Sequence, residues 1–180
     1  MTNDSFLIWV DLEMTGLDPE TCAIIEMAVI ITDKNLTELT APLVQTIWQP
    51  ESTLETMVPF VRKMHTDNGL LEQVRCSQIS IDDAEREAMV YLTRYVPYRC
   101  GHLAGNSVWQ DRRFLNKYMP TLVGYLHYRQ VDVSSLKQLA DWWYGVRYPK
   151  ADEGKHTALF DIRQSIAELK YYQERLKMVP

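Results

Sequence analysis

Residues 6–13 read Phe-Leu-Ile-Trp-Val-Asp-Leu-Glu, and this stretch decides the fold that we expect for the chain. Five apolar residues follow one another at positions 6–10, which is typical of a strand buried on both faces, although periodicity alone also allows a helix. Gly16 and Pro19 indicate that a turn follows. The sequence therefore predicts a buried strand that leads directly into two acidic side chains.

Two further strands are predicted close to the first one in the sequence. Residues 23–31 are rich in β-forming side chains and are interrupted only by Glu26, and residues 43–48 have the same character. Because short connections join these three strands, we expect an antiparallel meander.

Beyond these strands the hydrophobic period becomes that of a helix. Ser80 and Asp83 form a candidate capping box in front of the first long helix. A short fourth strand is expected at residues 102–104, and a helix that includes residues 115–122 follows it, with Pro120 as a kink or restart point.

The last third of the chain continues the alternation of strands and helices. A fifth strand is expected at residues 131–133, and Ser134 is expected to cap the helix after it. The final helix, residues 159–176, shows apolar side chains at three- and four-residue intervals. Three strands followed by this alternation predict an α/β fold with a mixed sheet and helices packed against it.

The size and composition of the chain predict one domain that spans residues 1–180. With 180 residues, of which 46% are hydrophobic, the chain can form one sizeable core, and no repeat or linker divides it. No apolar run approaches the roughly 18 residues of a membrane helix, and residues 1–5 do not resemble a targeting segment. We therefore expect a soluble cytoplasmic protein without a membrane partner, whose three widely spaced cysteines are reduced.

The net charge of −5 constrains the kind of nucleic acid that the protein can bind. Tight binding to a long polyanion needs many contacts from Lys and Arg to phosphates, and the composition does not favour such a surface. If the chain acts on nucleic acid, the substrate should be short, or bound cations should supply positive charge.

Asp11 and Glu13 follow the first apolar run at a spacing of two, so both carboxylates would project from the same face of a strand. Two buried carboxylates repel each other and lose hydration, which costs several kcal/mol per ion unless a positive group compensates. Residues 6–28 contain no Lys or Arg. This segment alone leaves a bound metal and an ion pair with a distant basic residue equally open.

Three more residues, two acids and a histidine, add to this pattern. Asp111 follows the turn-like residues 105–107, and Asp161 lies near the start of the last helix, where each could also be an ordinary first-turn acid. His156 has an ordinary pKa near that of an ideal general base at neutral pH, although a lone histidine is more often a surface residue. Carboxylate ligands favour Mg²⁺ or Mn²⁺ over Zn²⁺.

Three stretches resemble the exonuclease motifs of the DEDD superfamily, histidine subclass. They are D-L-E-M-T-G-L at 11–17, G-N-S-V-W-Q-D-R-R-F-L at 105–115 and H-T-A-L-F-D-I at 156–162. The same stretches, with H-Y-R at 127–129 and D-V-S at 132–134, are similar to the oligoribonuclease family. The likeness is collinear over residues 6–172, which is nearly the whole chain.

This resemblance implies an RNase H-like fold with a five-stranded mixed sheet, a homodimer, and 3′→5′ hydrolysis of RNA of two to a few nucleotides into 5′-monophosphates. It implies that two divalent cations, Mg²⁺ or Mn²⁺, are held by Asp11, Glu13, Asp111 and Asp161. It also implies that His156 takes a proton from the attacking water.

The resemblance further implies contacts with the substrate. Leu17 would wedge between the two bases, His65 would stack on one of them, and Tyr128 would stack on a base from the neighbouring subunit. The 5′-phosphate would be capped by four residues, Ser107, Arg129, Ser134 and Lys137. Packing roles for Leu17 and Tyr128 are the alternatives.

The sequence departs from the family pattern at three positions. Phe60 stands where Trp is common, Trp109 replaces a smaller residue, and Phe160 replaces an Asp. These departures concern the shape of the substrate pocket.

The sequence also leaves two other functions open. One alternative is another exonuclease of this subclass that acts on longer RNA or on DNA, as in proofreading. The other is a non-catalytic RNA-binding protein on the same fold, which the retained acids argue against.

Overall fold

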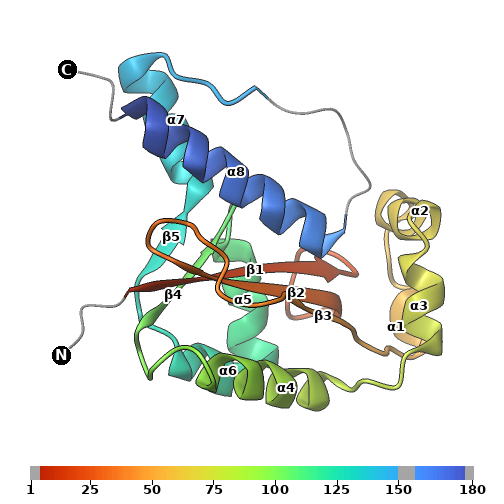
Figure 1. The fold of residues 1–180 in the computed structure, drawn as a ribbon. Helices are drawn as coiled ribbons and strands as arrows, with labels where there is room; N and C mark the ends of the chain where they lie inside the picture. The colour runs from red at the N-terminus through yellow and green to blue at the C-terminus, as the bar shows by residue number, and fades with distance from the viewer. Residues whose placement is uncertain (1–4, 150–156, 177–180) are drawn as a thin grey trace.

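The computed structural model describes residues 5–149 and 157–176, and these ranges contain a five-stranded sheet in the order β3-β2-β1-β4-β5 (Figure 1). The strands are β1 (Phe6–Met14), β2 (Ile24–Asp33), β3 (Leu43–Thr46), β4 (Gly101–Gly105) and β5 (Gln130–Asp132). β2 runs antiparallel to β1 and β3, whereas β4 is parallel to β1 and β5 is parallel to β4. The predicted mixed sheet, an antiparallel meander followed by parallel strands, is therefore confirmed.

Strand β1 lies at the centre of the sheet and is longer than the apolar run that predicted it. Its pairing with β2 continues in register over residues 6–13. Because side chains alternate along a strand, Ile8 and Leu12 belong to the core on one face of the sheet, whereas Trp9 belongs to the core on the other. The two acids that follow Trp9 share its face.

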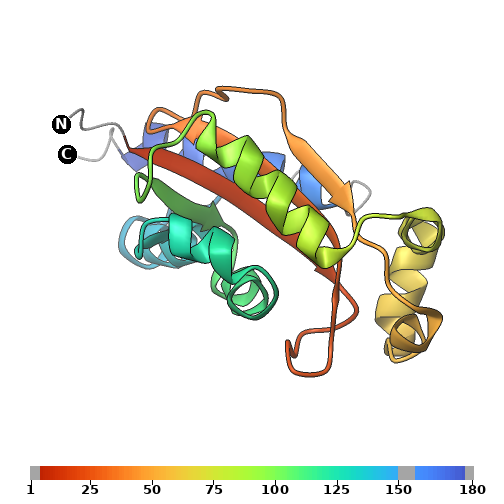
Figure 2. The ribbon, with the colours of Figure 1, turned by 90° about the horizontal axis from the view of Figure 1, so that it is seen from below.

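Helices cover both faces of this sheet (Figures 1 and 2). They are α1 (Glu51–Leu54), α2 (Pro59–Asp67), α3 (Leu70–Cys76), α4 (Ile81–Thr93), α5 (Trp109–Tyr118), α6 (Pro120–Tyr125), α7 (Val133–Tyr144) and α8 (Ala158–Leu176). α4, α5 and α6 contribute buried side chains to one core, and α7 and α8 contribute to the core on the opposite face. Within the described ranges, no helix has both the length and the apolar character needed to cross a bilayer.

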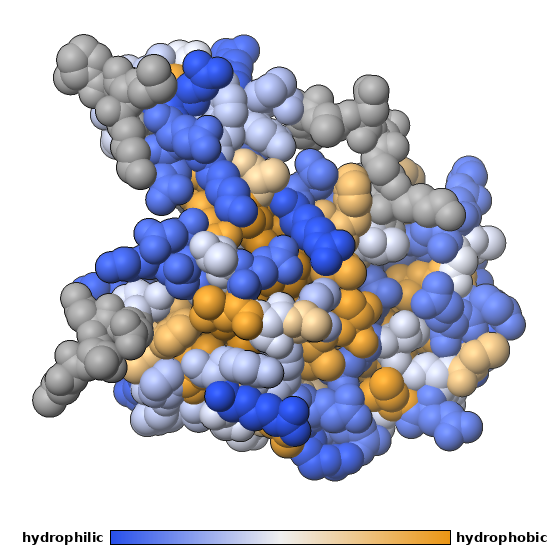
Figure 3. Space-filling model, viewed as in Figure 1, coloured by the Kyte–Doolittle hydropathy of each residue, from blue (hydrophilic) through white to orange (hydrophobic). Residues whose placement is uncertain are grey.

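The apolar side chains that hold these layers together come from strands and helices far apart in the sequence. On the α8 side, Trp9 and Ile30 cluster with Ile162 and Ile166 of the last helix. Figure 3, in the view of Figure 1, shows hydrophobic residues gathered in the middle of the molecule, between the layers of α8 and α4, with hydrophilic residues around them. The packing of α8 on β1 brings the first turn of the helix toward the acidic end of the strand.

The local predictions for the helices are mostly confirmed. Ser80 and Asp83 make both hydrogen bonds of the capping box of α4, and Pro120 begins a separate helix, α6. The prediction that Ser134 caps α7 is wrong, because the N-cap lies two residues earlier, at Asp132, whose carboxylate accepts a hydrogen bond from the Ser134 amide.

Helices α1, α2 and α3 lie beside one end of the sheet and have no counterpart in the sequence prediction (Figure 1). Their apolar residues, among them Leu54, Leu71 and Val74, form a separate cluster with Ile25 of β2. Helices this short gain their stability from tertiary packing and not from intrinsic propensity, so the local pattern does not reveal them.

Candidate active site and metal centre

Three of the predicted ligands meet at the end of β1. Oxygen atoms of Asp11, Glu13 and Asp161 all lie within 4.8 Å of one another. The pleat of β1 sends Asp11 and Glu13 toward the side on which Trp9 packs against α8, and Asp161 lies in the first turn of α8. The convergence thus follows from strand alternation and from the docking of one helix.

Asp111 lies next to this group and is attached to the same strand. It is buried in the first turn of α5, and its Oδ1 accepts a hydrogen bond of 3.1 Å from the Leu12 amide. The pairing between β1 and β4 stops at Trp9 and Ala104, so beyond that point the amides of β1 need another acceptor. The chain turns into α5 there, and Asp111 supplies the acceptor.

Burial, together with repulsion from neighbouring acids, raises the pKa values of Asp11, Glu13 and Asp111. For Glu13, burial followed by the charges of Asp161, Glu26 and Asp111 raises the pKa to about 8. Burial raises the pKa of Asp111 to about 7, although the hydrogen bond from Leu12 opposes the shift. The pKa of Asp11 is also raised well above its ordinary value, by burial first and by its acidic neighbours next.

Asp11, Glu13 and Asp111 need positive charge nearby, and the described part of the chain provides them with no Lys or Arg partner. Within residues 5–149 and 157–176, no Lys or Arg forms an ion pair with Asp11, Glu13 or Asp111. This observation disfavours the alternative of a structural ion pair. A cluster whose donors are all carboxylate oxygens matches a hard divalent cation such as Mg²⁺ or Mn²⁺, so the residues present fit the implied metal.

Glu26 is a fifth acid at the site and was not among the predicted functional residues. It is buried on β2 directly opposite Glu13. Its Oε2 accepts a hydrogen bond of 3.1 Å from the Ala158 amide at the start of α8. A signal was available in the sequence, because Glu26 is the only charged residue within the otherwise apolar second strand, residues 24–31.

His65 lies close to the acids but is enclosed. Its ring is buried in α2, with Nε2 3.1 Å from the Met14 carbonyl and Nδ1 4.0 Å from Glu13 Oε2. Nδ1 makes no hydrogen bond within the described part of the chain, and burial lowers the pKa of this imidazole. Stacking of His65 on a base stays a prediction, and it requires the ring to become accessible.

Three residues of the predicted phosphate cap line one pocket of about 660 Å³. The hydroxyl oxygens of Ser107 and Ser134 are 3.1 Å apart, and the Ser107 amide donates to Ser134 Oγ at 2.9 Å. Lys137 lines the same pocket and pairs with Glu168 at 3.3 Å. Arg147 adds a second cation to the lining, so the pocket has the hydroxyl and cationic groups that a phosphate needs.

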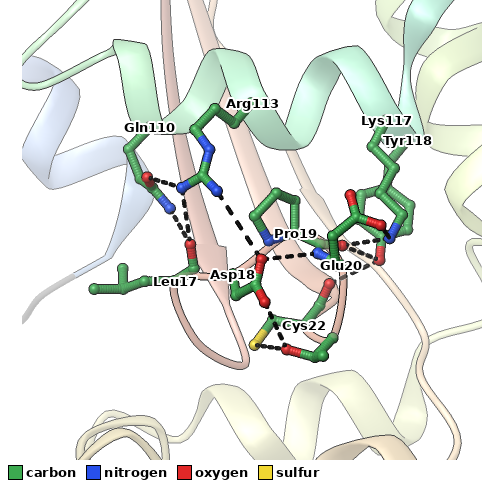
Figure 4. Close-up of polar contacts among 10 residues, drawn as sticks. Leu17, Asp18, Pro19, Glu20, Cys22, Gln110, Arg113, Lys117 and Tyr118 are labelled. Atoms are coloured by element: carbon green, nitrogen blue, oxygen red, sulfur yellow. Dashed lines mark hydrogen bonds and ion pairs between the residues drawn. The ribbon is translucent and has the colours of Figure 1, made fainter.

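The remaining predicted contact residues lie apart from that pocket. Tyr128 is 66% exposed and stacks on His127, with ring centroids 4.6 Å apart, and the Arg129 guanidinium lies 5.2 Å from the Tyr128 ring centre. The described residues that line this pocket do not include Tyr128 or Arg129. Leu17 is 71% exposed on the loop after β1 (Figure 4).

One predicted catalytic residue, His156, lies outside the described residues. Two of the three departures from the family pattern are exposed side chains: Phe60 on α2 is 77% exposed, and Trp109 at the start of α5 is 54% exposed. Phe160, the third, is half-buried in the first turn of α8. None of the three replaces one of the clustered acids.

Comparison with known proteins connects this geometry with nucleases. Residues 8–169 match a protein family described as exonuclease. The oligoribonuclease of Francisella tularensis subsp. tularensis is 48% identical over 171 residues, covering 94% of this chain and 95% of the relative. The oligoribonuclease of Shewanella loihica is 47% identical over 175 residues and covers 97% of each chain.

Solved structures show the same fold at low sequence identity. Exonuclease I of Methylocaldum szegediense superposes with a TM-score of 0.75 at 17% identity, and Escherichia coli exonuclease I in complex with an oligonucleotide gives 0.73 at 18%. The match covers 97% and 96% of this chain, which spans only 41% of either exonuclease I. The RNase H-like fold predicted from the sequence is confirmed.

Proposed function

Because this chain belongs to the exonuclease family and, within it, to the oligoribonucleases, we propose that it hydrolyses very short RNA, dinucleotides above all, into 5′-mononucleotides with the help of two divalent cations. The chain is a metal-dependent 3′→5′ exoribonuclease by family. The proposal concerns the length of its substrate and the number and identity of its cations.

One observation carries the mechanism: carboxylates of two strand residues and one helix residue converge within 4.8 Å, with Asp111 beside them. Asp11, Glu13, Asp111 and Asp161 would hold the cations, which supply a polarised water and charge stabilisation on the phosphate. The protein's own contribution is to hold these carboxylates in place through the β1 pleat, the Leu12 amide and α8.

His156 would accept the proton of the attacking water in this proposal. Support comes from the residues that follow it, because the Ala158 amide is bonded to Glu26, which lies opposite Glu13 in the sheet. Ala158, which follows His156 by two residues in the sequence, therefore lies beside the acidic cluster. The unperturbed pKa of an imidazole suits proton transfer near neutral pH.

The preference for short RNA would arise from closure at the 5′ end of the substrate. Leu17 would separate the bases, and a cap built from Ser107, Ser134, Lys137 and Arg129 would hold the 5′-phosphate, leaving no path for a longer strand. The pocket of about 660 Å³ supports the cap, because Ser107, Ser134 and Lys137 line it, whereas Arg129 lies apart from it. The net charge of −5 is consistent with a substrate that carries few phosphates.

A homodimer completes the proposal, with Tyr128 stacking on a base held by the partner subunit and His65 on the other base. The exposure of Tyr128 and its support by His127 are what such a role needs. The free state of all three cysteines agrees with the expected cytoplasmic location.

The test compares initial rates on a 5′-phosphorylated diribonucleotide, a long single-stranded RNA and a long single-stranded DNA, each with and without Mg²⁺ or Mn²⁺. We expect turnover to require the cation and to be fastest on the dinucleotide. Asp11→Ala and Asp161→Ala should abolish turnover while the circular dichroism spectrum stays that of a folded protein. Preference for a long strand would point to the alternative exonuclease, and binding without turnover would point to a non-catalytic RNA-binding protein.

A further inference from the structure

Leu17 is an exposed apolar side chain on a firmly held backbone. Its carbonyl oxygen accepts hydrogen bonds from Gln110 Nε2 and, at 3.4 Å, from Arg113 Nη1 (Figure 4). The two donors are themselves joined, because Arg113 Nη1 donates to Gln110 Oε1 at 2.9 Å. A leucine that is 71% exposed gains nothing from burial, so this arrangement fixes where the side chain is presented.

The rest of the loop is attached to the same helix. The Arg113 guanidinium lies 3.9 Å from Asp18, and Lys117 Nζ donates to the Pro19 carbonyl at 2.6 Å. The Tyr118 hydroxyl lies 2.7 Å from the Cys22 carbonyl, to which it donates. Figure 4 shows these side chains of α5 along the loop from Leu17 to Cys22. The loop therefore has a defined course over the helix.

The turn itself has little freedom to shift. A Cβ atom added at Gly16 would lie 2.7 Å from Cys22 Sγ, so the two ends of the loop are already in contact. The Asp18 carboxylate further closes the loop by accepting a hydrogen bond of 3.2 Å from the Glu20 amide. Leu17 thus projects from a closed turn whose orientation depends on its contacts with α5.

Helix α5 connects this turn to the catalytic acids. Residues 110, 113 and 117 lie along one side of the helix and contact the loop, whereas Asp111 projects to the buried side and binds the Leu12 amide. The helix is therefore bonded to β1 at the acids and to the loop at Leu17. Because α5 is rigid and is attached at both places, it sets the distance between the acids and Leu17.

We propose that Gln110 and Arg113 are positioning residues that hold Leu17 at a defined distance from the acids, so that α5 determines where a base stops relative to the phosphodiester that is cut. The inference rests on the proposed function, in which Leu17 separates the bases. A dinucleotide depends most on the distance between Leu17 and the acids, because it has no further nucleotides to align it.

The experiment uses four test variants, one control variant and two substrates. Gln110→Ala removes the hydrogen bond to the Leu17 carbonyl, and Gln110→Glu keeps the length of the side chain but replaces its amide donor. Leu17→Ala, alone and combined with Gln110→Ala, shows whether Gln110 acts through Leu17. Asn116→Ala is the matched control, because Asn116 is an exposed amide on the same helix. kcat and KM are measured on a 5′-phosphorylated dinucleotide and on the p-nitrophenyl ester of a nucleoside 5′-monophosphate, which has one base.

We expect Gln110→Ala and Gln110→Glu to lower kcat/KM on the dinucleotide between about 10-fold and 100-fold, with the ester changed less than about threefold. The double variant should be no worse than Leu17→Ala alone, because the two residues act as one unit. Asn116→Ala should match the wild type on both substrates, and thermal melts should show every variant folded.

Two results would overturn the positioning role: equal losses on both substrates, which would mean that the contact supports the acidic site, or additive losses in the double variant. Wild-type activity in both Gln110 variants would also exclude it. If the wild-type enzyme cuts a long strand but not the dinucleotide, the proposed function fails instead. In that case, comparing Leu17→Ala with the double variant on the long strand tests the role of Gln110.

Discussion

Among single residues, Glu26 shows how a side chain outside the usual ligand set can shape the site. It lies opposite Glu13 in the sheet, and its charge is the second-largest neighbour effect that raises the pKa of Glu13. At the same time its carboxylate holds the first amide of α8. The residue therefore influences the acids electrostatically and holds the helix that brings Asp161 to them.

Substitution of Glu26 should separate these two effects. Glu26→Gln keeps an oxygen that can accept from the Ala158 amide, so the free energy of unfolding should change little. Glu26→Ala leaves that buried amide without its acceptor, which should cost about 1–3 kcal/mol. Urea unfolding of both variants measures the difference.

The activity of the same variants gives the second readout. With the charge of residue 26 removed, Glu13 should ionise at lower pH, so the rising limb of the pH–rate profile of Glu26→Gln should shift toward acid. Asp82→Asn, which removes an exposed acid on α4, is the control and should leave the profile unchanged. A Glu26→Ala protein as stable as Glu26→Gln would contradict the tethering role.

Among the secondary-structure elements, the helices divide into those that carry site residues and those that only cover the sheet. α5 and α8 supply Asp111 and Asp161, and α5 also holds the loop of Leu17. α4 packs against the face of the sheet opposite α8 through Ala84, Ala88 and Leu92 and supplies no residue to the acidic cluster. Stability and activity can therefore be changed separately at α4.

The capping box of α4 offers such a change. Ser80→Ala removes the acceptor for the Asp83 amide and should lower the free energy of unfolding by about 1 kcal/mol without altering kcat or KM. Ser80→Asp, which retains an acceptor at the N-cap, should recover most of that stability. Thermal unfolding and a dinucleotide assay on the same samples check both statements, and a loss of kcat in Ser80→Ala at full folding would contradict them.

In the whole molecule, the acidic cluster makes stability depend on pH and on cations. Glu13 has a pKa of about 8 and Asp111 of about 7 in the folded protein, both above their ordinary values of 4.5 and 3.8. Between the ordinary and the raised values the folded state binds protons that the unfolded state has released. The stability of the metal-free protein should therefore be fullest at the acidic end and fall as the pH rises through about 7 and 8.

Thermal melts of protein treated with a chelator test this dependence. We expect Tm to fall between about pH 5.5 and about pH 8.5, and Mg²⁺ or Mn²⁺ to raise Tm most at the upper end, where the carboxylates are ionised and can bind. Asp11→Asn should raise Tm of the metal-free protein at high pH because it removes one repelling charge, and it should abolish activity. A metal-free Tm that rises over this range would show that the acids are not coupled as described.

The sequence on its own was sufficient for the elements with strong local patterns. The apolar run before Asp11 predicted the central strand, the Ser80–Asp83 pair predicted the start of α4, and the apolar spacing of residues 159–176 predicted α8. The acids of the site were candidates because they lie at the ends of such elements, and the resemblance to the exonuclease motifs implied their role as ligands. Helices α1 to α3 were missed because packing on Ile25, and not periodicity, stabilises them.

The contacts that give the site its shape became visible only in the folded chain. The hydrogen bond from Leu12 to Asp111 joins residues 99 positions apart in the sequence, and that from Gln110 to Leu17 joins residues 93 positions apart. The hydrogen bond from Ala158 to Glu26 joins residues 132 positions apart. Local sequence specifies periodicity and caps, since these depend on near neighbours. Which distant donor meets which acceptor depends on how the helices dock on the sheet, and that packing determines the register between Leu17 and the acids at the end of β1.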